Sequence, residues 1–330
     1  MKSVYIYPTY RPDKDATGNK YIEYFHDAFR RRFYVRELLS QFGIISLFFN
    51  IKSDLFIFHW VENIRFKRFG LVQVFVFVVG VSLLKILKKK IIWVLHNKKP
   101  HRENSCIALF CMRYIAHRAD LIITHSKEGI SFAGVTYGAK TVEKVKYIPH
   151  PVYSNELLQC GDIDWDIVIW GTVEKYKNIL EFVEFVNFHQ DFLKKRILIC
   201  GRCPDPEYAN RIVSVLPHNV TFKNEFIEDS QLREYLLRSR VILFTYKLDS
   251  VLSSGALVYS LNFNKKIVGP RGGAFKDLHP IVECYDSFND LLAINFDGVP
   301  CTAHIKKYLE ENSWDALPLK IITLGHTNHP

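Results

Sequence analysis

The feature that most constrains the fold is an alternation of short apolar segments with longer helical ones, which runs through the chain twice. The apolar segments are SVYIYP, DLFIFHW, KIIWVLHN, ADLIITHS and KVKYIPH in the first half, and DWDIVIWGT, KRILICGR, NVTFKNEF, SRVILFTY and KKIVGPRGG in the second. Such alternation is typical of βαβ units, in which helices cover both faces of a parallel sheet. We therefore predict an α/β protein with two doubly wound, Rossmann-like domains that face a cleft.

The length of the chain, 330 residues, also favours two domains over one, because single cores rarely grow beyond about 250 to 300 residues. Residues 149 to 161, PHPVYSNELLQCG, are rich in turn-forming residues and lack apolar periodicity. We place a linker there and predict domains at residues 1–150 and 151–330. The tail TLGHTNHP is expected either to fray or to cross back toward the first domain.

The charge balance is basic, since 44 Lys and Arg against 34 Asp and Glu give a formal charge of +10. Basic tracts such as 30–32 and 88–90 stand beside aromatic and aliphatic residues in the first third of the chain. That mixture favours an anionic membrane surface over nucleic acid, whose binding proteins place basic residues with exposed aromatics along a sheet face or a recognition helix. A solvated basic face without a partner is the alternative.

Residues 71 to 87, LVQVFVFVVGVSLLKIL, are almost wholly apolar. A transmembrane helix needs about 20 apolar residues and Lys85 interrupts this segment, so we predict a buried core helix, or one that dips into a membrane surface, in preference to a span. The opening residues MKSVYIYPTY lack an apolar signal core. We therefore expect a cytoplasmic protein that is peripheral at the inner face of the plasma membrane.

Histidines close four predicted strands of the first half: His59, His96, His125 and His150 stand at or just after the C-terminal ends. Open α/β sheets place their ligands at this edge of the sheet. The four side chains are therefore expected to lie near a ligand.

The loop in WVLHNKKPHRE adds His101, Arg102 and Glu103 to His96, and Glu62 follows another strand end. An imidazole or a carboxylate at such a position can act as a general base. The candidate catalytic residues are Glu103, His96 and Glu62. A zinc site is disfavoured because neither a tight HxxxH spacing nor a cysteine pair accompanies these residues, and plain loop packing is a further alternative.

The second half opens with a pattern that suits phosphate. A turn at Gly171 and Thr172 follows a strand, and Lys175 and Lys177 stand where a helix begins. Amide groups at a helix start attract anions, and an ammonium nearby neutralises their charge. Arg202 occupies the matching position after the segment ILIC. The alternative for the two lysines is an ordinary solvated surface, which is common for lysines near a helix start.

A small-residue loop precedes the apolar helix ALVYSL and consists of Ser253, Ser254 and Gly255. Residues of this size let backbone amides approach a diphosphate closely. An ordinary helix cap is the alternative interpretation, because serine is a favoured capping residue.

Taken in order, six segments resemble GT-B glycosyltransferases, in particular bacterial enzymes of exopolysaccharide and capsule assembly. The segments are FHWVEN (58–63), WVLHNKKPHRE (93–103), ADLIITHSKE (119–128), YIPHPVY (147–153), GTVEKYKN (171–178) and SSGALVYSLNFNKKIVGPRGG (253–273). The resemblance spans nearly the whole chain. It implies that the N-terminal domain binds the acceptor and the C-terminal domain binds a nucleotide sugar.

The resemblance also implies roles for particular residues. The implied donor-binding residues are Thr172, Lys175 and Lys177 at the phosphates, Ser253, Ser254 and Gly255 around the diphosphate, and Phe226 and Ile227 beside the nucleobase. Arg202 is expected at the leaving diphosphate from its own position after a strand, where a guanidinium can bind a phosphate through two hydrogen bonds. His96 and Glu103 match polar positions on the acceptor side.

One segment departs from the family pattern. Many retaining GT-B enzymes have paired glutamates where this chain has VLSSGALVY, with Val251 and Tyr259 near the corresponding positions. The pattern is more similar to the branch that includes glycolipid β-mannosyltransferases. The resemblance thus implies an inverting hexosyltransferase that uses GDP-mannose, or alternatively a UDP-sugar, and a lipid-linked or glycan acceptor in surface polysaccharide synthesis.

No cofactor or metal is expected, because the cleft segments contain no DxD-type carboxylate pair and lysines, an arginine and helix dipoles can carry the diphosphate charge. A non-catalytic nucleotide- or glycan-binding protein and another sugar-nucleotide enzyme are the alternatives. The latter is disfavoured because no GxGxxG follows the first strand.

Overall fold

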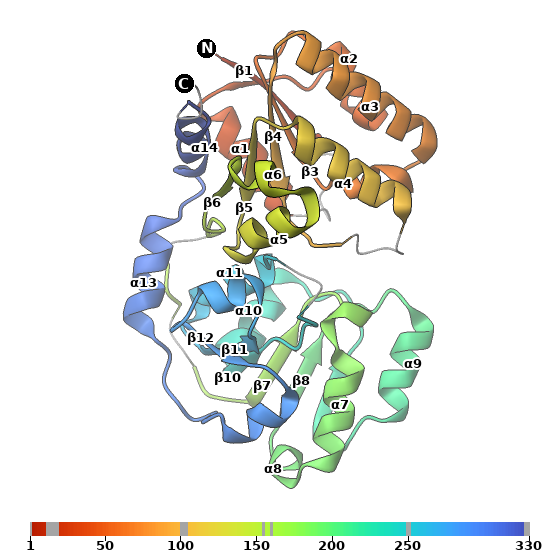
Figure 1. Cartoon of the computed structure of the whole chain (residues 1–330). Helices are drawn as coiled ribbons and strands as arrows, with labels where there is room; N and C mark the ends of the chain where they lie inside the picture. The colour runs from red at the N-terminus through yellow and green to blue at the C-terminus, as the bar shows by residue number, and fades with distance from the viewer. Residues whose placement is uncertain are drawn as a thin grey trace. The chain divides into compact units, whose positions relative to one another are not determined.

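The computed structural model describes residues 2–10, 20–99, 105–153, 156–158, 161–248 and 252–326 (Figure 1). The chain forms two compact units. The first domain comprises Met1–Pro151 and Asn312–Pro330, and the second comprises Val152–Glu311. The C-terminal residues thus belong to the first domain.

The first domain contains a parallel sheet of six strands in the order β2-β1-β3-β4-β5-β6. The strands are β1 Ser3–Tyr7, β2 Tyr34–Val35, β3 Leu55–His59, β4 Lys90–Leu95, β5 Leu121–Thr124 and β6 Val145–Tyr147. Its helices are α1 Lys20–Arg30, η1 Ser40–Ile45, α2 Ser46–Phe49, η2 Val61–Phe66, α3 Gly70–Ile86, α4 Cys106–Arg118, α5 Glu128–Tyr137, α6 Ala139–Val142 and α14 Leu317–His326. The last helix, α14, packs beside α1 (Figure 1).

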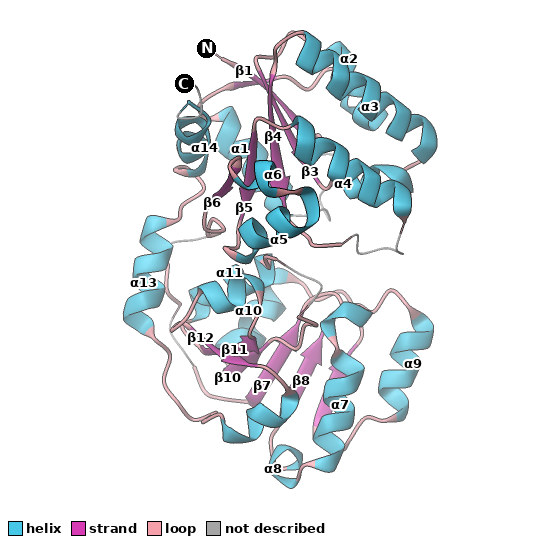
Figure 2. Ribbon diagram, viewed as in Figure 1, coloured by secondary structure: helices cyan, strands magenta, loops and turns pink. Residues whose placement is uncertain are grey.

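The second domain contains another six-stranded parallel sheet, in the order β12-β11-β10-β7-β8-β9 (Figure 2). The strands are β7 Trp165–Trp170, β8 Ile197–Cys200, β9 Val220–Lys223, β10 Ser239–Leu243, β11 Lys266–Pro270 and β12 Val282–Tyr285. Its helices are η3 Lys175–Lys177, α7 Ile179–Phe188, α8 Gln190–Leu193, α9 Pro206–Ser214, α10 Asp229–Leu237, α11 Gly255–Ser260, η4 Leu261–Phe263, α12 Gly273–Asp277, η5 Phe288–Ala293 and α13 Thr302–Glu311.

The strands of the second domain read as continuous apolar runs because each face of the sheet is covered by a core of its own. Ile167 and Ile169 of β7 lie in one apolar cluster, whereas Val168 between them lies in the other. Successive side chains of a strand point to opposite faces, so both faces exclude water. The predicted α/β class with two doubly wound domains is confirmed.

The order of strands locates the ligand edge of each sheet. In the second domain the chain leaves β7 in one direction to β8 and β9, and β10 pairs with the other side of β7. In the first domain the corresponding reversal lies between β1 and β3. Doubly wound sheets bind ligands outside the carboxyl ends of the strands at this switch point.

The apolar segment 71–87 forms most of α3, and only one face of this helix is buried. Gly70, Val74, Phe77 and Val81 pack inward, while Phe75 on the opposite face is 68% exposed. The helix is therefore neither a fully buried core helix nor a transmembrane helix. Within the described ranges, no helix is both long and apolar enough to cross a membrane.

Candidate functional site

Two glycines bring adjacent strands of the second domain into close contact at their carboxyl ends. Gly171 follows β7 with φ 93°, and Gly201 follows β8 with φ 145°. A Cβ on Gly201 would lie 2.4 Å from the carbonyl oxygen of Gly171, which is far inside van der Waals contact. Both positions need glycine for its positive φ and small size. The backbone at this edge is thereby left uncovered by side chains of its own.

Lys177 extends its ammonium toward this uncovered backbone. The residue is 5% exposed, a Cβ on Gly171 would lie 2.9 Å from Nζ, and Nζ is 5.4 Å from the centre of the Tyr246 ring. The carbonyl of Lys177 accepts a hydrogen bond from Thr245 Oγ1 at 2.5 Å, which ties η3 to the segment after β10. In the described part of the chain, no acidic side chain pairs with this ammonium. A buried, uncompensated positive charge of this kind favours binding of an anion.

Lys175, two residues earlier, lies in a different environment. Its side chain is 67% exposed and its Nζ lies 2.9 Å from Oδ2 of Asp205, which raises the pKa of Lys175. Asp205 also caps α9 through the amides of Glu207 and Tyr208. The ammonium of Lys175 is therefore already neutralised, whereas that of Lys177 is not. A phosphate-binding role for Lys175 stays a prediction.

Two further predicted donor residues flank the glycines. Thr172 follows Gly171 and is exposed, and Arg202 follows Gly201 and is exposed as well. The amide of Val173 donates to the carbonyl of Arg202 at 2.9 Å, so the two loops are joined beyond the ends of β7 and β8. The structure thus brings Thr172, Lys177 and Arg202 to the same edge of the sheet.

The loop of Ser253, Ser254 and Gly255 leads into α11. Oγ of Ser254 accepts a hydrogen bond from the amide of Leu257 at 3.2 Å, so this hydroxyl is a helix cap. The first amides of a helix have no partner within the helix, which leaves those of Gly255 and Ala256 available to a ligand. The capping role and the diphosphate role are compatible here. Val251 lies outside the described residues.

Phe226 and Ile227 follow β9 and differ in exposure. The ring of Phe226 is 65% exposed, whereas Ile227 packs against the apolar cluster on one face of the sheet. An exposed aromatic ring at a ligand edge can stack on a nucleobase. A role of Phe226 and Ile227 beside a nucleobase stays a prediction.

Glu62 is the second residue of η2, three positions after the end of β3, and is 3% exposed. Nδ2 of Asn97 donates a hydrogen bond to its Oε1 at 3.0 Å. Burial raises the pKa of Glu62, and the hydrogen bonds from its own amide and from Asn97 oppose this only in part. A carboxylate with a raised pKa is a stronger proton acceptor, as a general base requires.

The four strand-end histidines gather around one aromatic side chain. The ring of Tyr21 on α1 makes edge contacts with the rings of His59, His96, His125 and His150 at centroid distances of 5.7, 4.8, 5.6 and 5.2 Å. All four histidines are buried. No sequence signal identified Tyr21, because its position on a helix depends on packing against strands far away in the chain.

Hydrogen bonds fix the orientation of these histidines. Nδ1 of His125 lies 2.8 Å from the carbonyl of Ile148 and must carry the proton, so Nε2 accepts from the Tyr21 hydroxyl at 2.7 Å. Burial lowers the pKa of His125 to about 4 and that of His150 to about 3. Both rings are therefore neutral near pH 7.

His96, a predicted base, is part of the same cluster. Its Nε2 lies 3.0 Å from Nδ1 of His59, and its ring stacks on Trp60 at 4.4 Å. Burial lowers the pKa of His59, and Nε2 of His59 is buried and has no hydrogen-bond partner among the described residues. His96 and Glu62 lie after neighbouring strands, while His101, Arg102 and Glu103 lie outside the described residues.

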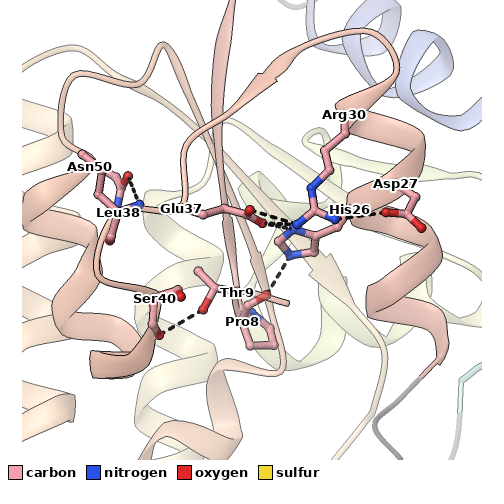
Figure 3. A network of polar contacts seen from close by, with 9 residues as sticks. All are labelled: Pro8, Thr9, His26, Asp27, Arg30, Glu37, Leu38, Ser40 and Asn50. Carbon is pink, nitrogen blue, oxygen red and sulfur yellow. Dashed lines mark hydrogen bonds and ion pairs between the residues drawn. The ribbon is translucent and has the colours of Figure 1, made fainter. Parts of the chain in front are cut away.

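A polar network fixes the chain that leaves β1 at the same edge (Figure 3). The ring nitrogens of His26 lie 2.9 Å from Oε1 of Glu37 and 3.0 Å from the carbonyl oxygen of Pro8. Arg30 donates to both carboxylate oxygens of Glu37 at 2.8 and 2.9 Å. Burial raises the pKa of Glu37, but the hydrogen bonds from His26 and Arg30 outweigh it and hold that pKa below its ordinary value.

Among the residues that the structure describes, no group of three or more His, Cys, Asp and Glu side chains is arranged to hold a metal ion. Lys177 and Arg202 are basic residues of the second domain whose charges suit a diphosphate.

Comparisons with known proteins show the class of fold. No protein-family model and no curated protein matches the sequence. The structure is similar to HepE of Anabaena, solved with UDP, with a TM-score of 0.68 and 13% identity over 99% of this chain and 100% of that one. It is also similar to the lipopolysaccharide outer core galactosyltransferase WaaB, with a TM-score of 0.59 and 11% identity over 99% of both chains.

A trehalose-phosphate synthase of Burkholderia vietnamiensis, described as UDP-forming, gives a TM-score of 0.56 and 11% identity over 94% of this chain and 87% of that one. At these identities the likeness defines the fold and leaves the activity open. The chain has the GT-B fold of glycosyltransferases.

Proposed function

We propose that this protein is a glycosyltransferase that moves a hexose from a nucleoside diphosphate sugar to a lipid-linked or glycan acceptor in surface polysaccharide synthesis. The observation that carries the proposal is the buried ammonium of Lys177, which lies beside Gly171 at the switch point of the second sheet and has no acidic partner among the described residues. A phosphate-bearing anion satisfies such a position, because it offers several charged oxygens to the ammonium and to the nearby amides.

The diphosphate is the leaving group of the proposed reaction, so its stabilisation contributes to the rate as well as to binding. Lys177 and Arg202 supply positive charge, and the amides at the start of α11 supply hydrogen-bond donors. Donors that are held in place before the reaction stabilise developing charge without reorganising, and this stabilisation often contributes more to catalysis than any other effect. The proposed mechanism therefore needs no metal ion.

Two nucleosides are candidates for the donor sugar nucleotide, namely uridine and guanosine. The family resemblance of the sequence favours GDP-mannose. The solved structures of HepE are complexes with UDP, with UDP and glucose, and with UDP-glucose. We therefore propose that UDP-sugars and GDP-mannose be compared directly, with the exposed ring of Phe226 as the proposed contact to the base.

The acceptor hydroxyl needs a general base in an inverting transfer, and the first domain is the proposed source. Glu62 fits because its pKa is raised by burial and because Asn97 holds its carboxylate in place. His96 is tied to His59 and stacked on Trp60. Glu103 stays a candidate on sequence grounds alone.

A membrane surface is the proposed location of the acceptor. The exposed face of α3 presents Phe75 and Leu71, and the turn before the helix contains Lys67 and Arg68, which are exposed. Apolar side chains bordered by basic ones suit the headgroup region of an anionic bilayer. We propose peripheral binding through this face at the inner surface of the plasma membrane.

The proposal is tested by release of nucleoside diphosphate in EDTA. The purified protein is incubated with UDP-glucose, UDP-galactose, UDP-N-acetylglucosamine or GDP-mannose and a polyprenyl-diphosphate saccharide mixture. The expected result is release from one donor, which Lys177→Met abolishes. Nucleotide binding without release from any donor would favour a non-catalytic binding protein, and absence of both would refute the proposal.

A further inference from the structure

A second basic site lies at the opposite edge of the first sheet, at the N-terminal end of β4. It is a cavity of about 550 Å³ between the end of α3, the segment before β6 and α14. The lining residues are Lys85, Lys88, Lys89, Lys90, Asp120, Glu143, Lys144 and Gly325. Because parallel strands place their N-terminal ends together, this cavity is separate from the histidine cluster at the carboxyl ends.

The cavity carries more positive charge than its own carboxylates neutralise, since five lysines face two acidic residues. Lys85 pairs with Oδ1 of Asp120 at 2.5 Å, and Oδ2 of Asp120 accepts from the amide of Ile91 at 2.9 Å. Both carboxylate oxygens of Asp120 thus have a partner. Lys90 and Lys144 bond to backbone carbonyls, which are neutral acceptors and leave the lysine charge in place.

The end of α3 brings three consecutive lysines to this cavity. The amide of Lys89 donates to the carbonyl of Leu84, and that of Lys88 donates to the carbonyl of Lys85. This is a Schellman turn, which places Lys88 in the left-handed conformation with φ 53°. Glycine is preferred at that position because it has no Cβ. The backbone conformation at Lys88 is therefore unfavourable for a lysine. This residue nevertheless places a positive charge at the cavity.

The gathered charges also affect one another. Burial lowers the pKa of Lys90 and of Lys144, nearby Asp120 opposes the lowering, and the lysines Lys2 and Lys85 add to it. A bound anion would relieve this repulsion between like charges. Ile86 and Leu87, which lie in the chain between the lining residues Lys85 and Lys88, are 75% and 47% exposed.

We propose that this lysine cavity binds the phosphate group of an anionic membrane lipid. The lysines supply the charge and hydrogen bonds for the phosphate, and the exposed side chains of Ile86 and Leu87 contact the apolar part of the same surface. The inference deepens the membrane contact of the proposed function and rests on it. It adds a defined headgroup site to the unspecific contact made by the exposed face of α3.

The test is flotation of the full chain with phosphatidylcholine vesicles that contain or lack phosphatidic acid. The variant is Lys88→Gly combined with Lys89→Gln, which removes two charges and relieves the left-handed lysine, so its melting temperature should not fall. We expect binding about 30-fold weaker than wild type, since each lysine near an anionic surface contributes about a fivefold gain. A matched control, Lys194→Gln with Lys306→Gln, removes two exposed charges from the second domain and should stay within about threefold.

Competition with inorganic pyrophosphate distinguishes a lipid phosphate from a free phosphate compound as the ligand of the cavity. Partial displacement of the wild type from phosphatidic acid vesicles supports the site, because pyrophosphate shares its chemistry. Pyrophosphate binding without a preference for phosphatidic acid overturns the assignment to a lipid, and equal losses in the two double variants overturn the cavity as the site. UDP and GDP binding by the same variants should be unchanged. Wild-type protein that floats with phosphatidic acid but binds no nucleotide would contradict the glycosyltransferase proposal alone.

Discussion

Lys177 carries the charge on which the proposed donor site depends, and replacing it by methionine keeps most of its length. We expect Lys177→Met to weaken nucleoside diphosphate binding about 10- to 100-fold, because hydrogen bonds to charged groups contribute about 1.5 to 3 kcal/mol. The free energy of unfolding of the unliganded protein should not fall, because the buried ammonium opposes folding. Titration calorimetry and urea unfolding measure the two effects.

A lysine elsewhere in the same domain provides the control. Lys194 is exposed and pairs with Asp191 at 3.5 Å, so Lys194→Met should leave nucleotide binding within about twofold of wild type. Wild-type affinity in Lys177→Met, or a large loss of its stability, would show that the ammonium has another role.

Glu62 yields a prediction about pH because burial raises its pKa. The stability that comes from the protonated carboxyl is fully present below the unfolded pKa of about 4.3 and is lost as the pH rises through the folded value. Glu62→Gln cannot ionise. It should therefore match the wild type near pH 4 and be more stable than the wild type near pH 8 in urea unfolding.

The same substitution distinguishes a base from a structural carboxyl. As a general base, Glu62 should contribute about 10²- to 10⁴-fold to kcat, and the rise of rate with pH should disappear in Glu62→Gln. A change in stability with an unaltered pH profile would remove Glu62 from the mechanism. In that case His96 and Glu103 would be the remaining candidates.

The difference between Lys175 and Lys177 could not be read from the sequence. Both stand near the start of a helix at positions that suit phosphate, and their spacing gives no reason to prefer either. Asp205 neutralises one, while Gly171 and Tyr246 surround the other. These partners come from other strands and loops, so only the assembled sheet separates the two lysines.

Among the structural elements, the turns after β7 and β8 are the most sensitive to substitution. A Cβ on Gly201 would meet the Gly171 carbonyl at 2.4 Å, so Gly201→Ala should lower the free energy of unfolding by about 2 to 4 kcal/mol. A Cβ on Gly161 would meet no atom of the described residues within 4 Å, so Gly161→Ala should change the free energy of unfolding by less than about 0.5 kcal/mol. Similar urea midpoints for the two variants would contradict this account of the turns.

The helix α3 offers two phenylalanines with opposite expectations. Phe77 is fully buried and contacts Phe58 and Tyr114, so Phe77→Ala should lower the free energy of unfolding by about 3 to 5 kcal/mol. Phe75 is 68% exposed, so Phe75→Ala should change it by less than about 0.5 kcal/mol.

Vesicle flotation should rank the same two variants in the reverse order. Phe75→Ala removes an apolar contact worth about 1.5 to 3 kcal/mol when fully buried in the membrane surface, and so should weaken binding about tenfold or more. Folded Phe77→Ala should float like the wild type. Undiminished flotation of Phe75→Ala would exclude this face of α3 as the membrane contact.

At the level of these elements, the sequence predicted strands better than it predicted α3. Strands covered on both faces are short and apolar, and they leave a clear pattern such as IVI within 167–169. The sequence of a helix that is apolar on all sides has no amphipathic pattern, so it does not indicate which face is buried. Packing of Gly80 against Leu47 decides that face, and the contact depends on the position of α2.

For the whole molecule, the doubly wound class followed from the rhythm of strands, but the two strand orders did not. In the first sheet β2 lies at the edge beside β1, whereas the second sheet has the order of a dinucleotide-binding fold. Strand pairing depends on contacts between distant segments. Donor, acceptor and stereochemistry depend on a few side chains in loops, and a fold shared at 11 to 13% identity does not determine them.

We propose that the second domain binds a nucleoside diphosphate at Lys177, and thermal unfolding with UDP or GDP in EDTA measures this binding. A ligand at 100 times its Kd should add about 2.7 kcal/mol of stability, which raises Tm by several degrees. We expect this rise with one of the two nucleotides for the wild type and its loss in Lys177→Met. No rise with either nucleotide, with or without magnesium, or an equal rise in Lys177→Met, would contradict it.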